Sequence, residues 1–242
     1  MNQDPTHSTR ETASRRPIIR AVVGFALYLL LTPAALFLAA GTLDWPMALI
    51  YVGLILLATL GSRLAVWKRN PDTLRERAKY QDVEGALPGD RLLVGVVALY
   101  GPLLTAVIAG LDHRFGWPPA ISPLVQYLGL AGMVTGYGLG VWAMIENRFF
   151  SAVARIQKDR GQTVVTTGPY RIVRHPSYAG ALIAVLALPL MLDAVWAILP
   201  GLGMIVATVW RTRLEDRMLL GDLDGYAEYA GQTKYRLLPG IW

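Results

Sequence analysis

YAGALIAVLALPLMLDAVWAILPGLGMIVATVW, residues 178–210, is an apolar stretch in which Asp193 is the one charged residue. Each half, Tyr178–Leu192 and Ala194–Trp210, is shorter than the roughly 20 residues that a membrane-spanning helix needs. A single residue joins the two halves, so we expect a tight helical hairpin instead of two ordinary, independent spans. Polar residues flank this hairpin at both ends.

Four further apolar stretches precede the hairpin and come close to the length of a spanning helix. They cover about residues 21–40, 46–67, 92–111 and 123–145. The whole chain is 54% hydrophobic and only 17% charged, against about a quarter charged in soluble domains. The sequence therefore predicts an all-α, polytopic integral membrane protein with about six hydrophobic helices.

The division of the chain follows from the same stretches. We expect a single membrane domain over residues 1–242, with a cytoplasmic tail at 1–20 and four transmembrane helices within 21–145. Polar content rises from Glu146 onward while the apolar segments shorten. Residues 146–242 are therefore the predicted catalytic and cofactor-binding region.

The basic residues predict the orientation. Of the 23 Lys and Arg residues, all except Arg114 fall before the first stretch, in the connection from Arg63 to Arg91, between the fourth and fifth stretches, or after Trp210. Under the positive-inside rule, this places both termini in the cytoplasm, and a bacterial inner membrane is the expected location. The net charge of +6 also favours contact with anionic membrane lipids, whereas nothing in the pattern supports a nucleic-acid partner.

Several kinds of site are excluded or disfavoured by composition. The chain has no cysteine, which rules out disulfides and thiol nucleophiles. Its three histidines, His7, His113 and His175, lie too far apart in sequence for a zinc motif, so no metal site is predicted. The glycines at 132, 136 and 140 are spaced as in close helix–helix packing, and this spacing leaves the oligomeric state open.

Two polar clusters flank the hairpin. GPYRIVRHPSYAG, residues 168–180, precedes it, and RTRLED, residues 211–216, follows it. Arms of about 22 and 25 Å return Arg211 to the height of His175. Each member has a plain explanation as a lipid anchor, a helix start or a surface ion pair. Their convergence at one membrane height instead indicates a pocket at the cytoplasmic edge.

These clusters resemble the isoprenylcysteine carboxyl methyltransferase family. The resemblance covers about residues 142–242 and rests on both clusters together with the neighbouring motifs Asn147-Arg-Phe-Phe150, Ile156-Gln157 and the tail from Tyr226 to Trp242. It implies an integral membrane enzyme that transfers a methyl group from S-adenosylmethionine to a lipid-like acceptor entering from the bilayer.

The resemblance also implies roles for single residues. Arg174, Arg211 and Glu215 are expected to be catalytic, with Arg174 facing an acceptor carboxylate. The residues expected to contact the cofactor are Gln157, Gly168, Tyr170, His175, Tyr178, Gly180, Glu215 and Asp216. A carboxylate acceptor is already ionised, so positioning by hydrogen bonds is the catalytic device that these residues offer.

Other functions remain open at this point. Membrane sterol-type reductases, which use NADPH, share a related histidine–tyrosine motif and a similar tail. A non-catalytic membrane scaffold is a third class. Among methyl acceptors, a phospholipid amine or a small thiol competes with the carboxylate, and an amine needs a base such as Glu146 or Glu215.

Overall fold

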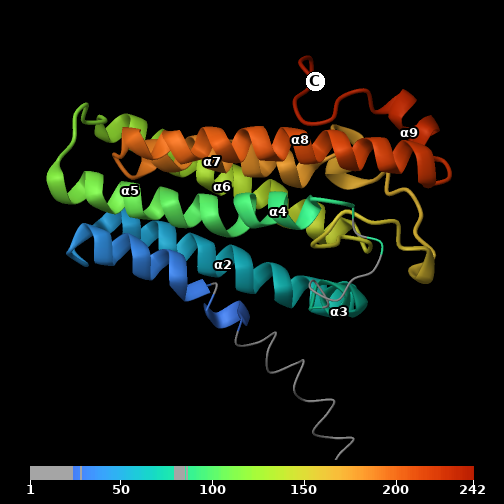
Figure 1. Cartoon of the computed structure of the whole chain (residues 1–242), viewed down its shortest axis with the longest axis horizontal. Helices are drawn as coiled ribbons and strands as arrows, with labels where there is room; N and C mark the ends of the chain where they lie inside the picture. The colour runs from blue at the N-terminus through green and yellow to red at the C-terminus, as the bar shows by residue number, and fades with distance from the viewer. Residues whose placement is uncertain (1–23, 28, 79–84, 86) are drawn as a thin grey trace, which may run out of the picture.

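The computed structural model describes residues 24–27, 29–78, 85 and 87–242, so the proposed cytoplasmic tail at 1–20 lies outside the described residues. Every regular element in this part of the chain is helical. The long helices lie side by side with their axes roughly parallel (Figure 1). The prediction of an all-α, polytopic fold is confirmed.

Four helical segments are long and apolar enough to cross a membrane by length and composition. They are α2 (Pro46–Arg69), the run Asp90–Phe115, α6 (Pro123–Glu146) and the run Val195–Asp222. A shorter apolar helix, Gly24–Ala40, corresponds to the first predicted span. Large apolar side chains are exposed on the outer faces of these helices, as expected for surfaces that meet lipid.

The run Asp90–Phe115 is not one regular helix. It consists of α4 (Asp90–Gly95), a π-helical turn η1 (Val96–Tyr100) and α5 (Gly101–Phe115). Such turns occur mostly within α-helices and are frequent at functional sites. The residues of α4 and η1 border the polar region described below.

The predicted hairpin is present, but its second arm is longer than expected. α7 covers Pro176–Met191, and Leu192–Ala194 connect it to the short turn η4 (Val195–Ala197) and to α8 (Ile198–Asp222). The sequence predicts that this arm ends at Trp210, because charged residues usually mark the point where a helix leaves the membrane. Arg211, Thr212 and Asp216 are instead buried against other parts of the protein, which lets the helix continue through them.

Small residues bring α6 and α7 into close contact. A Cβ atom added to Gly136 would lie 2.5 Å from the Gly180 carbonyl oxygen and 2.9 Å from the Ala184 nitrogen. One added to Gly132 would lie 2.8 Å from Ala187 Cβ. Because such distances are too short for real contacts, the absence of side chains here sets the helix separation. The predicted small-residue packing therefore lies within one chain, between α6 and α7.

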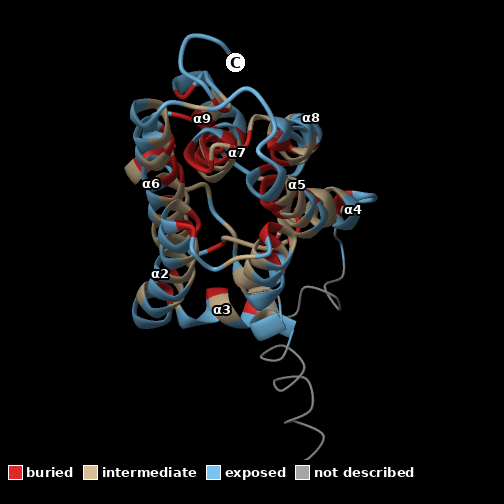
Figure 2. Ribbon diagram, turned by 90° about the vertical axis from the view of Figure 1, so that its left-hand side faces the viewer, coloured by how far each residue is buried: buried red, intermediate tan, exposed pale blue. Residues whose placement is uncertain are grey.

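The polar elements gather at one end of the helices. The short helices α3 (Pro71–Ala78) and α9 (Tyr226–Gln232) lie at the end of the bundle opposite the turns after residues 40, 115 and 191 (Figure 1). The connector of residues 147–175 and its short 3₁₀ turns η2 (Lys158–Arg160) and η3 (Gly168–Arg171) lie at the same end. Buried positions are densest on α7, which lies between α6 and α8 (Figure 2).

Two clusters of buried apolar residues support this arrangement. The larger one includes Leu36, Trp45, Met133 and Met191 and joins the first apolar helix, α2, α6 and α7. The smaller one consists of Ala143, Tyr170, Leu219, Tyr226 and Tyr229. The smaller cluster connects α6, α8, α9 and the connector, so it supports the polar end of the molecule.

Candidate functional site

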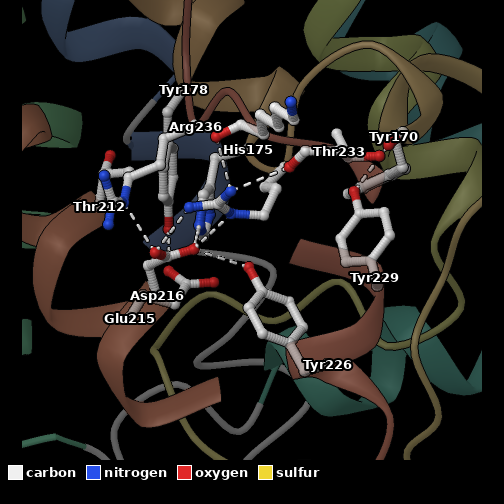
Figure 3. Close-up of polar contacts among 12 residues, drawn as sticks. Tyr170, His175, Tyr178, Thr212, Glu215, Asp216, Tyr226, Tyr229, Thr233 and Arg236 are labelled. Atoms are coloured by element: carbon white, nitrogen blue, oxygen red, sulfur yellow. Dashed lines mark hydrogen bonds and ion pairs between the residues drawn. The ribbon is translucent and has the colours of Figure 1, made fainter. Parts of the chain in front are cut away.

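The carboxylate of Asp216 lies at the centre of a buried ion-pair network (Figure 3). Arg174 donates to it from Nε at 2.8 Å and from Nη2 at 3.0 Å, and Arg236 donates from Nε at 2.7 Å. The hydroxyl of Tyr226 adds a hydrogen bond of 2.9 Å. Because Asp216 is only 1% exposed, two cations and a hydroxyl compensate for the cost of burying its charge.

His175 contacts the same carboxylate. Its Nε2 lies 3.3 Å from Asp216 Oδ1, and an ionised carboxylate only accepts hydrogen bonds, so this contact assigns a proton to Nε2. The ring stacks on Tyr178, with 5.6 Å between the ring centroids and 4° between the planes. His175 thus has a fixed ring orientation at the start of α7.

The C-terminal tail holds the chain immediately before α7. The backbone N–H groups of Arg174 and His175 donate to the carbonyls of Tyr235 and Arg236, each at 2.9 Å. Arg174 Nη1 also donates to the carbonyls of Thr233 and Lys234. The tail therefore fixes Arg174 and His175 through both backbone and side chain.

Tyr178 and Glu215 connect α7 to α8. The hydroxyl of Tyr178 donates to Glu215 Oε2 at 2.5 Å. The guanidinium of Arg211 lies over the Tyr178 ring, 5.2 Å from its centroid, within the range of a cation–π contact. His175 and Glu215, which come from distant parts of the sequence, therefore flank one tyrosine.

Arg211 has its own buried carboxylate partner, Asp90 at the start of α4. Arg211 Nε donates to Asp90 Oδ1 at 2.6 Å, and Nη2 donates to Oδ2 at 3.3 Å. The backbone N–H of Ala154 in the connector also donates to Asp90, at 2.8 Å. Asp90 thus joins α4, α8 and the connector.

The connector is held together by the side chain of Gln157. Its Nε2 donates to the Phe149 carbonyl at 2.6 Å, and its Oε1 accepts from Arg160. Gln157 is 1% exposed. The adjacent Arg155 is paired with Glu76 of α3 at 2.7 Å, which attaches the connector to the rest of the polar end.

A cavity of about 260 Å³ lies among these elements. This volume is close to the lower end of the roughly 300–1,000 Å³ range of small-molecule pockets. Its lining combines aromatic rings, polar side chains and the apolar residues Val94 and Ala98 of α4 and η1. The cavity therefore borders both the polar end and a helix that is long enough to span the membrane.

Burial changes the ionisation of groups around the cavity that lie outside the long helices. Burial raises the pKa of Tyr229 to about 12 and also raises the pKa of Tyr170. The pKa of Tyr226 is raised by burial and by the charge of Asp216. Burial lowers the pKa of Arg174, but its hydrogen bonds and charge interaction with Asp216 outweigh this effect and raise it. These tyrosines are therefore neutral hydrogen-bonding groups at physiological pH.

Most of the residues expected from the sequence come together at this cavity. Those that line it are Gln157, Tyr170, Arg174, His175, Tyr178, Arg211 and Glu215. Asp216 lies behind this lining, with its oxygens directed to Arg174, Arg236 and Tyr226. Its position fits a role in holding Arg174 and His175.

The two predicted glycines have other surroundings. Gly180 packs against the backbone of α6, beside Gly136 and Gly140. Gly168 has a φ of +57°, and a Cβ there would lie 2.9 Å from Glu146 Cγ. Gly168 is thus needed for a left-handed turn next to α6, and neither glycine is among the residues that line the cavity.

Sequence reasoning gave no role at this site to Asp90, to Thr233 or to Arg236, and used Tyr226 and Tyr229 only as family motifs. Asp90 follows Gly89 and begins an apolar run, which is the pattern of an ordinary helix start. Tyr229 donates to the Tyr170 carbonyl at 2.6 Å, a contact between residues far apart in sequence. One signal was available for the tail: four aromatic and two basic residues lie in the segment from Tyr226 to Trp242.

Comparison with known proteins agrees with this geometry. Residues 124–221, which include α6, the connector, α7 and nearly all of α8, match the family described as phospholipid methyltransferase. This part of the chain carries the pattern of a membrane methyltransferase family related to the isoprenylcysteine carboxyl methyltransferases, and the resemblance expected from the sequence is confirmed.

One curated relative is the cobalt-zinc-cadmium resistance protein CzcN of Cupriavidus metallidurans. It is 33% identical over 141 residues, which are 57% of this chain. The chain matches 61% of the length of that relative. The likeness therefore covers a part of each protein.

Proposed function

We propose that this protein is a methyltransferase of the membrane that uses S-adenosylmethionine and acts on an amphiphilic acceptor from the bilayer. The observation that carries the proposal is the cavity itself. It brings Tyr178 and Glu215 beside His175, next to the apolar residues Val94 and Ala98 of a helix long enough to span the membrane. The match of residues 124–221 to a phospholipid methyltransferase family supports the same reaction class.

The residues at the cavity fit the chemistry of the cofactor. A carboxylate such as Glu215 suits an ammonium group or ribose hydroxyls, and the rings of Phe149 and Tyr170 in the lining suit an adenine. His175 presents a polar ring at the same cavity. When bound, the cofactor supplies an electrophilic methyl group on a sulfonium.

The ion pairs of Arg174 and Arg211 affect which charge the methyl acceptor is expected to carry. Arg174 is paired with Asp216, and Arg211 is paired with Asp90. Both cations are therefore neutralised within the protein, whereas Glu215 faces the cavity with Tyr178 as its hydrogen-bond donor. This balance favours an acceptor with an amine headgroup over the carboxylate that the sequence resemblance suggested.

Glu215 is the proposed base for such an acceptor. An amine of ordinary basicity is protonated at neutral pH and needs to lose a proton before its nitrogen becomes a nucleophile. Glu215 would take that proton, while the Tyr178 hydroxyl holds the carboxylate in place.

An amphiphilic carboxylate is the second candidate acceptor. It is favoured by Arg211, whose guanidinium lines the cavity and is 9% exposed. An already ionised acceptor requires no base, so Glu215 would then serve the cofactor alone. The two candidates consequently differ in how much the reaction depends on the carboxylate of Glu215.

The proposed topology rests on charge. The end of α2, α3 and the connector carry many of the basic residues, and they lie at the same end of the molecule as the cavity. The positive-inside rule puts this end in the cytoplasm, and the proposed location is a bacterial inner membrane. The cofactor would then enter from the cytoplasm and the acceptor from the bilayer.

The experiment is methyl transfer from labelled S-adenosylmethionine by the purified protein in two kinds of vesicle. One kind contains phosphatidylethanolamine, and the other contains a neutral lipid with a long-chain isoprenoid carboxylic acid. We expect label in the amine lipid, with at least a 100-fold lower rate for Glu215→Gln, in line with the effect of losing a general base. Glu228→Gln, an exposed change on α9, is the matched control and should leave the rate unchanged.

Other outcomes separate the competing functions. Label only in the carboxylic acid would overturn the amine acceptor and retain methyl transfer. Absence of label in both vesicles, together with oxidation of NADPH by the same preparation, would support the reductase. Absence of both activities would support a non-catalytic role.

A further inference from the structure

Asp90 lies outside the part of the chain that matches the methyltransferase family, yet it touches the site. It is the first residue of α4 and is 1% exposed. Both of its carboxylate oxygens contact Arg211, and Oδ2 also accepts the N–H of Ala154. A carboxylate buried this deeply is costly unless its partners are held in place.

The contacts of Asp90 continue through Arg211 to the cavity. Arg211 lies over the ring of Tyr178, and Tyr178 donates to Glu215. A chain of direct contacts through Arg211 and Tyr178 therefore connects Asp90 to the carboxylate of Glu215 in the cavity. None of these steps passes through Asp216, whose carboxylate contacts Arg174, His175, Tyr226 and Arg236 (Figure 3).

The sequence supplies a competing partner for Arg211. Arg211 and Glu215 are four residues apart on α8, the separation at which oppositely charged side chains pair along a helix. In the structure, Arg211 is paired with Asp90, and Glu215 accepts from Tyr178. Among the ion pairs of the described residues, Arg211 thus pairs with Asp90 and not with Glu215.

We infer that Asp90 is a positioning residue, which holds Arg211 beneath Tyr178 so that the carboxylate of Glu215 stays available to a ligand in the cavity. This inference rests on the proposed function, because it assigns Glu215 to cofactor or acceptor. Removal of the Asp90 charge would free Arg211 to pair with Glu215. The ligand would then compete with an internal cation.

The test measures binding of S-adenosylhomocysteine to the full chain in lipid nanodiscs. We expect Asp90→Asn to weaken the Kd about 10-fold, which corresponds to about 1.4 kcal/mol. Asp90→Glu retains the charge but shifts Arg211, so it should lose affinity, by less than Asp90→Asn does. In the double variant Asp90→Asn with Arg211→Gln, the freed cation is gone, so the Kd should be tighter than in Asp90→Asn alone.

Glu76→Gln is the matched control. Glu76 is 6% exposed and pairs with Arg155 of the same connector, but it has no contact with Arg211 or Tyr178 in the pairs that the structure describes. If Asp90 acts only by anchoring the connector, Glu76→Gln will weaken binding as much as Asp90→Asn does. That result, or an unchanged Kd in Asp90→Asn, would overturn the inference and leave the proposed function intact.

A reporter that needs no cofactor separates the two claims. The chain has no cysteine, so Ser177→Cys places a single thiol beside Tyr178 at the cavity. We expect Asp90→Asn to change its maleimide labelling rate several-fold, and Glu76→Gln to leave it unchanged. If the unaltered protein does not bind S-adenosylhomocysteine, the proposed function fails, and this labelling comparison alone decides for or against the positioning role.

Should Asp90→Asn fail to fold, Asp90→Glu carries the same comparison. The longer side chain shifts Arg211 without removing the charge, so a weaker Kd than that of Glu76→Asp supports the inference. Equal affinities in these two variants would overturn it.

Discussion

The guanidinium of Arg174 and the carboxylate of Asp216 form a two-point ion pair, with N–O distances of 2.8 and 3.0 Å. Both residues are almost fully buried, at 6% and 1% exposure. The pair joins the segment before α7 to the polar half of α8. It therefore holds in place the two elements that supply Tyr178 and Glu215.

Asp216→Asn should destabilise the protein strongly. The change leaves the buried Arg174 and the partly exposed Arg236 without their negative partner. Breaking a buried pair in this way costs about 3–5 kcal/mol. Denaturant unfolding in detergent micelles measures the effect. Asp224→Asn, at an exposed position just after α8, is the control and should change stability by less than about 0.5 kcal/mol. Equal stability of the two variants would contradict a structural role for Asp216.

Glu215→Gln should show a characteristic pH dependence if the acceptor is an amine. Without a base, the reaction depends on the fraction of amine that is already deprotonated, which grows as pH approaches an amine pKa of about 10. The rate of the variant should therefore rise with pH between 7 and 9 more steeply than the rate of the unaltered protein. Parallel pH profiles for the two proteins would count against Glu215 as the base.

Tyr229→Phe should change stability at alkaline pH. The pKa of Tyr229 is about 12 in the folded protein, because of burial, against 10.0 for an ordinary tyrosine. Between these values the unfolded chain loses the proton and the folded chain keeps it, so this contribution is present below pH 10 and is lost as pH rises toward 12. The unfolding free energy of Tyr229→Phe should fall less between pH 9 and 11.5.

The comparison needs one control. Tyr235→Phe, at a residue that is 39% exposed, should keep the alkaline loss of the unaltered protein. If Tyr229→Phe showed the same alkaline loss as Tyr235→Phe, burial of the Tyr229 hydroxyl would not contribute to it.

Gly180→Ala should push α6 and α7 apart. A Cβ at Gly180 would overlap the Gly136 carbonyl oxygen and lie 3.1 Å from the Gly140 nitrogen. Overpacking of this kind typically costs about 1–3 kcal/mol. Gly138→Ala, on the facing helix α6 but with no atom within 4 Å of its added Cβ, should be neutral or slightly stabilising. Thermal unfolding of both variants in one detergent makes the comparison, and similar melting temperatures would refute the packing argument.

The helical architecture was predictable because membrane helices leave a strong local signal. Runs near 20 apolar residues predicted α2, α6 and the run Asp90–Phe115 within a few residues. The predicted end of the second arm at Trp210 was wrong, because α8 continues to Asp222. The sequence alone does not show whether Arg211 is exposed to water or buried against Asp90. Only the tertiary partner distinguishes a membrane exit from a buried site residue.

The site was predictable to a similar extent. The two polar clusters around the hairpin predicted that His175, Tyr178 and Glu215 converge, because a hairpin returns the chain to its starting height. The different roles of the neighbouring residues Glu215 and Asp216 could not be predicted from the sequence. Glu215 faces the cavity and Asp216 faces Arg174, Arg236 and Tyr226, and this difference arises from a tail about 20 residues downstream.

The single continuous helix α8 connects the part of the protein inside the bilayer to the candidate site. Its 25 residues form a rod of about 37 Å whose first part is apolar and whose last turns carry Arg211, Glu215 and Asp216. A membrane thinner than the apolar part tilts such a rod. Since tilt at one end displaces the other, lipid chain length becomes a physical variable that sets the alignment of the carboxylates with α7.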